Sequence, residues 1–276
     1  MNNMFSVAMS VYKNDNPEDF KEAVHSIYHN QSVKPSEIIL VQDGPIPIEL
    51  KEVIDELVAE IPVMKLVVFE HNRGHAAARQ AGLEKASNNL VAIMDADDIA
   101  VTNRFELTLK AFEDNPNASV IGGNINEFIE NLDNRVGCRI VPERDVEIKR
   151  YLRKRCPMNL VTVMYHKERI QEVGGFIDWY CEEDYYLWIR LALAGHEFYN
   201  IQENLVNVRV GTEMYSRRWG WSYFKSEATL QRYMWKHDVI GLGRYLYNVA
   251  MRFALQVAMP NRVRGWVFRK FARTKE

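Results

Sequence analysis

The first half of this 276-residue chain alternates short apolar runs with amphipathic segments, and this alternation limits its fold more than any other feature. The apolar runs are rich in β-branched residues and predict strands at residues 6–11, 37–42, 65–70, 90–94 and 119–122. The amphipathic segments predict helices near residues 17–29, 48–60, 75–86 and 103–113. Strands alternating with helices are joined by right-handed crossovers, so we expect an α/β fold with a mostly parallel sheet flanked by helices.

Polar side chains follow four of the predicted strands at the point where each strand ends. Tyr12 follows the first strand, Asp43 the second, Asn72 the third, and the run from Asp95 to Asp98 the fourth. Ligands of such sheets bind beyond the carboxyl ends of the strands. Because polar residues follow all four strands at the same position, they predict one binding site at this edge of the sheet.

The second half of the chain no longer shows the regular alternation of predicted strands and helices. Its signals are a basic helix-like stretch at 149–155, a strand-like stretch at 160–165, a tight turn at Gly174-Gly175, and the start of a helix at 182–190. After Arg209 the chain is predicted to be helical to its end. We therefore expect an α/β domain at residues 1–210 and a C-terminal helical extension at residues 211–276.

Composition excludes several classes of protein. The chain has 35 Lys and Arg against 37 Asp and Glu, a net charge of −2, which argues against a nucleic-acid-binding protein. Its three cysteines, Cys138, Cys156 and Cys181, are odd in number and widely spaced, so we expect free thiols in a reducing compartment. We find neither a signal-peptide pattern nor an uncharged apolar run of the ~18 residues that span a bilayer, and expect a cytoplasmic protein.

Asp95 and Asp97 stand on a predicted strand-to-loop turn where both carboxylates can reach one cation. Magnesium and manganese prefer such oxygen ligands together with substrate phosphates. The alternative is that the acidic run caps the helix predicted near Asn103, because Asp is common at turns. The sequence alone leaves both interpretations open, and Asp98 fits a structural role.

Asp43 and Arg79 each allow a structural interpretation as well as a functional one. Asp43-Gly44 is a common turn signal, and the functional alternative is that Asp43 accepts a hydrogen bond from a nucleobase. Arg79 is either a solvated helix-surface residue or a ligand of a base or phosphate.

Asp184 lies at the predicted start of a helix, on the face that carries Leu187, Trp188 and Leu191. The helix dipole stabilises a carboxylate at this position. An ionised carboxylate suits a general base that takes a proton from a hydroxyl. Helix capping by Asp184 and its neighbour Glu183 is the structural alternative.

Taken together, these motifs resemble the family 2 glycosyltransferases with the GT-A fold, from residue 5 to about residue 209. The matching segments are Ser10-Val11-Tyr12, Asp43-Gly44, Asn72-Arg73-Gly74 with Arg79-Gln80-Ala81-Gly82, Asp95-Ala96-Asp97, and Gly174-Gly175-Phe176 with Glu183-Asp184. The order and the spacing of the motifs agree with the family throughout. Gln80 stands where the family usually has Asn.

The resemblance implies an inverting transfer of a sugar from a nucleoside-diphosphate donor, with UDP as the expected nucleotide. Ser10, Tyr12, Asp43, Arg79 and Asp95 would bind the donor. Asp97, helped by Asp95, would hold a divalent metal, manganese or magnesium. Asp184 would be the catalytic base, with Glu183 and Trp188 in acceptor or auxiliary roles. Residues 1–124 would form the nucleotide-sugar-binding half and 125–210 the acceptor-binding half.

The resemblance extends, less specifically, to the bacterial exopolysaccharide, capsule and O-antigen subgroup, which implies a saccharide acceptor and favours a lipid-linked one. Related sequences often have His where Leu160 stands, which leaves the acceptor contacts open. The Gln-x-x-Arg-Trp motif of processive synthases is missing, and Arg217-Arg218-Trp219 is not that motif. The resemblance therefore favours adding one sugar per acceptor.

Other enzyme classes fit poorly, because the first strand lacks the Gly-rich loop of dehydrogenases and nucleotidyltransferases and the chain lacks a P-loop. The remaining alternative is a catalytically silent, membrane-surface nucleotide-sugar-binding module of the same fold.

The C-terminal segment is basic. Residues 239–275 contain Arg and Lys but no Asp or Glu. A helical projection from Asn261 separates an apolar arc (Val263, Val267, Phe268, Phe271) from a basic one (Arg262, Arg269, Lys270, Arg273), with Arg264 as the exception. Basic amphipathic helices bind anionic membranes, so we expect peripheral association with the inner face of the cell membrane. Packing of the apolar arc on the catalytic domain is the alternative.

Overall fold

The structure is a computed structural model that describes residues 4–211 and 219–258. Its first half alternates strands β1 (Phe5–Val11), β2 (Glu37–Gln42), β3 (Met64–Val68) and β4 (Leu90–Met94) with helices α1 (Pro17–Ile27), α2 (Ile48–Glu60) and α3 (His75–Lys85). β3, β2, β1 and β4 lie side by side in this order and all pair in parallel. The expected parallel α/β arrangement of this half is confirmed.

The second half completes a single sheet with antiparallel strands at its centre and edge. Its elements are β5 (Ile99–Ala100), α4 (Arg104–Asp114), β6 (Ala118–Phe128), β7 (Arg135–Arg139), α5 (Asp145–Leu152), a short 3-10 helix (Leu160–Thr162), β8 (Met164–His166), α6 (Lys167–Glu172), α7 (Glu183–Leu193) and β9 (Glu197–Arg209). Within the described residues the strand order is β3-β2-β1-β4-β8-β6-β9-β5, and β7 pairs with β6. β8 is antiparallel to both β4 and β6.

Three differences from the sequence-based expectation concern this half. The strand predicted at 119–122 is the 11-residue β6, which continues past residue 124 and so joins the two predicted halves in one sheet. Residues 160–162 form a 3-10 helix, and only 164–166 of the predicted strand are extended. β9 was not predicted, because its polar residues hide the alternation of a strand that pairs with β6 for most of its length.

The sheet has a hydrophobic core on each face, because successive side chains of a strand point to opposite sides. Val7 and Met9 of β1 lie in the core beneath α1, α2 and α4. Ala8, between them, lies in the core beneath α3, α5, α6 and α7. The sheet is therefore covered by helices on both faces, as expected.

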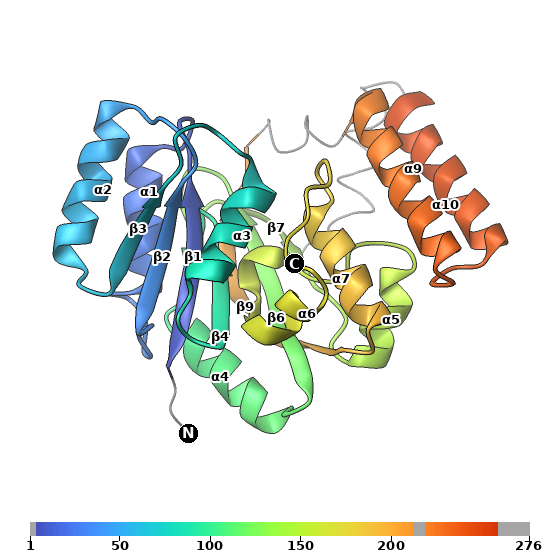
Figure 1. Cartoon of the computed structure of the whole chain (residues 1–276), viewed down its shortest axis with the longest axis horizontal. Helices are drawn as coiled ribbons and strands as arrows, with labels where there is room; N and C mark the ends of the chain where they lie inside the picture. The colour runs from blue at the N-terminus through green and yellow to red at the C-terminus, as the bar shows by residue number, and fades with distance from the viewer. Residues whose placement is uncertain (1–3, 212–218, 259–276) are drawn as a thin grey trace.

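The C-terminal extension forms α9 (Gly220–Lys236), α10 (Leu242–Phe253) and a short π-helical segment (Ala254–Ala258). α9 and α10 lie side by side near α5 and α7, at the end of the molecule opposite α2 (Figure 1). In the parts that the structure describes, no helix has the length and apolar character needed to cross a membrane. The amphipathic segment predicted from Asn261 lies outside the described residues.

Glu37 forms hydrogen bonds that connect several segments at the amino-terminal edge of the sheet. Its buried carboxylate accepts hydrogen bonds from Ser6 Oγ (2.6 Å), from Lys65 Nζ (2.6 Å) and from the backbone N and Oγ of Ser87 (2.8 Å each). Burial alone would raise the pKa of Glu37, but these hydrogen bonds outweigh it and lower the pKa to about 2. The charged form of Glu37 is therefore favoured in the folded state.

We expect Glu37→Gln to lower the free energy of unfolding at pH 7 by about 2 kcal/mol. The whole pKa shift corresponds to about 3 kcal/mol, which we reduce because solvent screens the exposed Lys65. A lowered pKa stabilises the fold above the unfolded value near 4.5 and loses that effect as the pH falls toward 2, so the difference from wild type should shrink in acid. Urea unfolding between pH 7 and pH 3 measures it. Asp55→Asn, in the exposed Lys51–Asp55 pair, is the control and should change little.

Candidate active site

The carboxyl ends of β2 and β3 meet at Asp43. One carboxylate oxygen of Asp43 accepts a hydrogen bond from the backbone N of Arg73 (2.6 Å), and the other accepts from Asn72 Nδ2 and Gly74 N (2.9 Å each). Gly44 has a positive φ of 89°, and a Cβ there would lie 2.5 Å from Asn72 N. The Asp43-Gly44 turn and the 72–74 loop are therefore built as one unit, which only glycine at position 44 permits.

The acidic run follows β4, as predicted, and its members lie in different environments. The Asp97 side chain is open to solvent, whereas Asp98 is 3% exposed. Partial loss of hydration, together with repulsion from Asp95, raises the pKa of Asp97 to about 6. Burial, with repulsion from Asp97 and Asp95, raises the pKa of Asp98 well above its ordinary value. The turn thus concentrates negative charge that a cation would relieve.

Arg209, at the end of β9, holds this acidic turn in place. Its backbone N donates to Asp98 Oδ1 (2.9 Å), and its Nε donates to the carbonyl oxygen of Asp97 (3.2 Å). The same guanidinium pairs with Asp19 (3.1 Å) and Glu22 (2.9 Å) of α1. Arg209 was not predicted as a site residue, because its partners lie about one hundred or more positions away in the chain.

Arg104 lies beneath the acidic turn and was also missed. Its buried guanidinium donates to the carbonyl oxygen of Ile93 (2.6 Å). Burial lowers the pKa of Arg104 to about 9, and the carboxylates of Asp95 and Asp98 oppose that change. Arg104 therefore remains a cation at neutral pH and partly balances the acidic turn above it.

Arg79 joins the acidic turn to the start of α7. From α3, its guanidinium contacts Glu183 Oε1 at 2.5 Å and Asp95 Oδ1 at 3.4 Å. Burial alone would lower the pKa of Arg79, but the negative charges of Asp95, Glu183 and Asp184 raise it overall. Arg79 is thus a buried ion-pair residue between two acidic motifs, and the solvated-surface alternative is wrong.

Asp184 lies in the first turn of α7, as predicted, and is partly buried. Its Oδ1 accepts a hydrogen bond from the backbone N of Tyr185 (2.7 Å), and its Oδ2 lies 3.6 Å from Cys156 Sγ. Burial and the nearby Asp184 charge raise the pKa of Cys156 well above its ordinary value, so Cys156 is a neutral thiol donor. The free-thiol prediction for the three cysteines is confirmed, and one of those thiols contacts the candidate base.

Trp188 does not reach the surface of the site. Its side chain is fully buried and packs edge-on against Phe198, with ring centroids 6.4 Å apart. A direct acceptor contact by Trp188 is therefore wrong. Only the auxiliary role fits, in which Trp188 supports α7 from the core.

Two contacts from elsewhere in the chain fix the approach to α7. Gln80 Oε1 accepts a hydrogen bond from the backbone N of Phe176 (2.8 Å), and a Cβ on Gly175 would lie 2.2 Å from that oxygen. The Gln that replaces the usual Asn therefore holds the Gly-Gly turn. From α9, Tyr223 donates to Glu182 Oε1 (2.7 Å), so the C-terminal extension contacts the N-cap residue that precedes α7.

The remaining predicted residues line the same edge of the sheet. Ser10 lies with Arg79 and Asp95 around one small cavity at the end of β1. Tyr12 lies near His75 at the start of α3, with ring centroids 6.3 Å apart. Arg217 and Arg218 lie outside the described residues. The edge therefore combines two open carboxylates, a buried guanidinium and a carboxylate at a helix start, a set suited to binding a metal and phosphates and to accepting a proton.

Comparison with known proteins shows the family to which this chain is similar. A model of the family described as glycosyl transferase family 2 matches residues 6–176. The chain is 35% identical over 229 residues to the amylovoran biosynthesis glycosyltransferase AmsE of Erwinia amylovora, covering 83% of this chain and 85% of that protein. It is 34% identical over 269 residues to the UDP-Gal:alpha-D-GlcNAc-diphosphoundecaprenol beta-1,3-galactosyltransferase of Escherichia coli, covering 98% and 96%.

Solved structures share the architecture at low sequence identity. The complex of S. aureus TarS with UDP-GlcNAc has a TM-score of 0.65 and 17% identity, covering 91% of this chain and 72% of that one. The mannosyltransferase PcManGT from Pyrobaculum calidifontis, solved with GDP-Man and Mn²⁺, has a TM-score of 0.61 and 16% identity, covering 97% and 79%. At these identities the similarity concerns the fold.

Proposed function

The chain belongs to glycosyltransferase family 2 and has the GT-A fold, and from this premise we propose that it is an inverting transferase that uses a UDP-sugar and a lipid-linked saccharide acceptor. The observation that carries the proposal is the position of Arg79. It contacts Asp95 on the predicted donor side and Glu183, 104 residues away, on the predicted acceptor side. Two motifs distant in sequence therefore meet where a sugar would pass from one substrate to the other.

For the donor, we assign the base to Asp43 and Tyr12, and the ribose and diphosphate to Ser10, Arg79 and Asp95. A carboxylate has about four acceptor positions. Asp43 uses three of them for hydrogen bonds shorter than 3 Å to the 72–74 loop. One position therefore remains for an N–H of the nucleobase.

For the metal, the residues present fit a hard divalent ion such as Mn²⁺ or Mg²⁺. Asp97 and Asp95 offer only oxygen ligands, and their mutual repulsion contributes to the raised pKa of Asp97. A bound ion would neutralise charge on the departing nucleoside diphosphate. Arg209 and Arg104 hold the backbone of this segment, through the carbonyl oxygens of Asp97 and Ile93.

For the acceptor, Asp184 takes the proton from a hydroxyl group while that oxygen bonds to the anomeric carbon and the nucleoside diphosphate leaves. An in-line displacement inverts the anomeric configuration. The dipole of α7 stabilises the carboxylate before the reaction, and Cys156 and the Tyr185 amide orient it. We keep residues 1–124 as the donor half and 125–210 as the acceptor half of the domain.

A transfer assay tests the proposal directly. UDP-, GDP- and TDP-sugars are first screened by thermal shift with Mn²⁺, because a ligand of the native state raises its apparent stability. The stabilising donor is then incubated with a polyprenyl-diphosphate-linked GlcNAc, and NMR of the product reads the configuration of the new linkage. We expect a UDP-sugar to bind and the product to be inverted. Donor binding without transfer or hydrolysis would instead support the silent binding module.

The lipid-linked acceptor also suggests where the C-terminal extension lies. α10 exposes Leu242, Leu246 and Tyr247 by 51–57% of their surfaces, and Trp221 of α9 is 52% exposed beside Phe253. Arg252 points inward, where it pairs with Glu227 at 2.8 Å. The described helices therefore pack on the domain through one face and expose an apolar face on the other side. We propose that this apolar face, together with the basic residues that follow it in the sequence, binds the inner surface of the cell membrane.

We expect the full chain to co-sediment with liposomes in proportion to their anionic lipid fraction, and a truncation after residue 258 to bind more weakly. Each Lys or Arg near the surface contributes about 1 kcal/mol. Leu246→Glu, which puts a charge on the exposed face of α10, should weaken binding further. Sedimentation that ignores the anionic fraction, the truncation and Leu246→Glu alike would contradict membrane association.

A further inference from the structure

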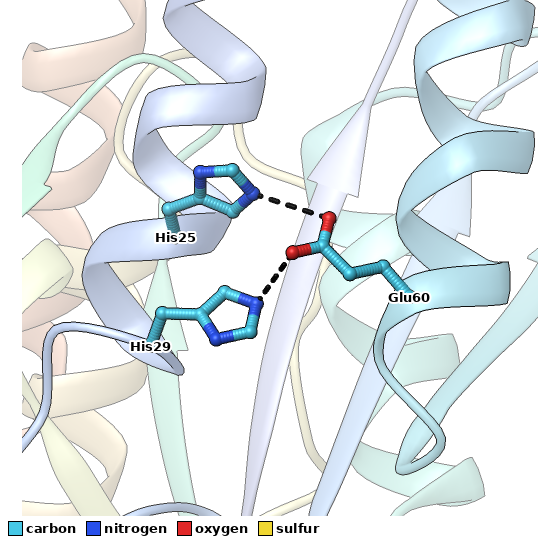
Figure 2. A group of neighbouring side chains, drawn as sticks. All are labelled: His25, His29 and Glu60. Carbon is cyan, nitrogen blue, oxygen red and sulfur yellow. Dashed lines mark hydrogen bonds and ion pairs between the residues drawn. The ribbon is translucent and has the colours of Figure 1, made fainter.

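His25, His29 and Glu60 form a cluster that the proposed reaction does not use (Figure 2). His25 lies in the last turn of α1, His29 in the turn that follows it, and Glu60 is the last residue of α2. His25 Nε2 lies 3.4 Å from one carboxylate oxygen of Glu60, and His29 Nε2 lies 2.8 Å from the other. In the described ranges, these are the only three His, Cys, Asp or Glu side chains whose ligand atoms all lie within 4.8 Å of one another.

The cluster is remote from the candidate active site. α1 and α2 each follow a strand, so their first residues lie near the carboxyl ends of the strands and their last residues at the opposite edge of the sheet. The three side chains are 31–39% exposed, so an ion can reach them from solvent. A ligand bound there would not compete with a donor or an acceptor.

The three candidate ligand atoms lie close enough together to approach one tetrahedral ion. Zn²⁺ binds His nitrogen at about 2.0–2.1 Å and carboxylate oxygen at about 2.0–2.2 Å, which places neighbouring ligand atoms about 3.4 Å apart. In the structure each imidazole faces a different oxygen of Glu60, at 3.4 Å for His25 and 2.8 Å for His29. Binding one ion through a single Glu60 oxygen therefore needs a small rotation of the carboxylate, since one ligand atom from each residue already lies within 4.8 Å of the others. Two histidines four positions apart in the chain, one in the last turn of α1 and one just after it, make a three-ligand set with one carboxylate and leave a fourth position for water.

Electrostatics favours a cation at this point. The carbonyl ends of α1 and α2 carry the negative poles of their helix dipoles, which repel the Glu60 carboxylate and attract positive charge. One turn earlier the same two helices are joined by a full ion pair, Lys21 with Glu56 at 2.7 Å.

We propose that His25, His29 and Glu60 bind a Zn²⁺ ion, or a transition-metal ion of similar preference, that clips the end of α1 to the end of α2. Imidazole suits zinc, copper and nickel, whereas the all-oxygen pair Asp95 and Asp97 suits magnesium and manganese. The two sites therefore select different ions. Zinc at the clip stabilises the folded state, because the three ligands come together only when α1 and α2 pack side by side.

Calorimetric titration of the untagged full chain with ZnCl₂ tests the proposal. We expect wild type to bind one Zn²⁺ at this site and to melt at a higher temperature with Zn²⁺ than without it. His25→Gln and His29→Gln should each weaken binding at least ~10-fold, since even changes to groups behind the ligands cost that much. Glu60→Gln, which keeps both imidazoles, is a third variant that should weaken binding if a histidine variant folds poorly.

Two controls separate the clip from other sites. Glu56→Gln removes the neighbouring Lys21 ion pair on the same helices without removing a ligand and should leave Zn²⁺ binding unchanged. Asp97→Asn removes the proposed catalytic metal ligand and should also leave it unchanged. The proposal is overturned if the His25, His29 and Glu60 variants bind Zn²⁺ like wild type, or if Asp97→Asn alone abolishes binding.

Discussion

We expect the replacement of Asp184 by Asn to lower the turnover number for sugar transfer by about 10²–10⁴-fold and to leave donor affinity nearly unchanged. Asn has the shape of Asp but cannot accept the proton of the acceptor hydroxyl. The loss falls on the transition state, because the base acts only as the new bond forms. Steady-state kinetics with saturating acceptor, together with UDP-sugar binding by calorimetry, measures both quantities.

Two neighbours of Asp184 make this experiment selective. Glu183→Gln removes the ion pair with Arg79 but keeps the Asp184 carboxylate, so its effect should be smaller and should include weaker donor binding. Cys156→Ala removes the thiol 3.6 Å from Asp184 Oδ2 and should cost less than the loss of the base itself. If Asp184→Asn instead loses donor affinity and keeps its turnover number, Asp184 is a binding residue and Glu183 becomes the first candidate for the base.

Asp97→Asn is expected to reduce donor turnover at least ~100-fold, which corresponds to about 2.7 kcal/mol of activation free energy. The substitution keeps the side-chain shape and removes the charge of the most exposed carboxylate on the acidic turn. The rate should also require a higher Mn²⁺ concentration, so the measurement is a series of rates against Mn²⁺ for wild type and variant. Wild type in EDTA should lose activity in parallel.

Asp98→Asn is the matched control for Asp97. It changes the adjacent residue in the same way, but the Asp98 side chain is buried and accepts a hydrogen bond from the Arg209 backbone. We expect this variant to lower stability and to retain the wild-type dependence on Mn²⁺. Full activity of Asp97→Asn, or of wild type in EDTA, would remove the metal role assigned to the acidic turn.

The parallel half of the fold could be predicted because local pattern and tertiary structure agree there. β1 and β2 are apolar, bounded runs, and α2 repeats its apolar side chains at the helical period, so both their existence and nearly all their ends were predicted. β9 could not be predicted in this way. It is stabilised by pairing with β6 and by the helices that cover it, and its own sequence from Glu197 to Arg209 includes several polar residues.

The site divides in the same manner. Asp43, Asp95, Asp97 and Asp184 were identified because each follows a strand or begins a helix, positions that local sequence marks. Arg209, Arg104, Cys156 and Tyr223 were not, because nothing near them in the sequence indicates their partners. Each of these residues belongs to a segment that is distant in the sequence and that the fold brings next to the candidate site.

The sequence by itself therefore determined the alternation of strands and helices, and it predicted the edge of the sheet for the proposed site and the acidic residues at that edge. These depend on periodicity and turn chemistry, which act within a few residues. Only the tertiary structure decided that Arg79 joins Asp95 to Glu183, that Trp188 is buried beneath α7, and that His25 and His29 face Glu60. Such contacts depend on how the helices pack on the sheet, and packing brings together residues that no local pattern relates.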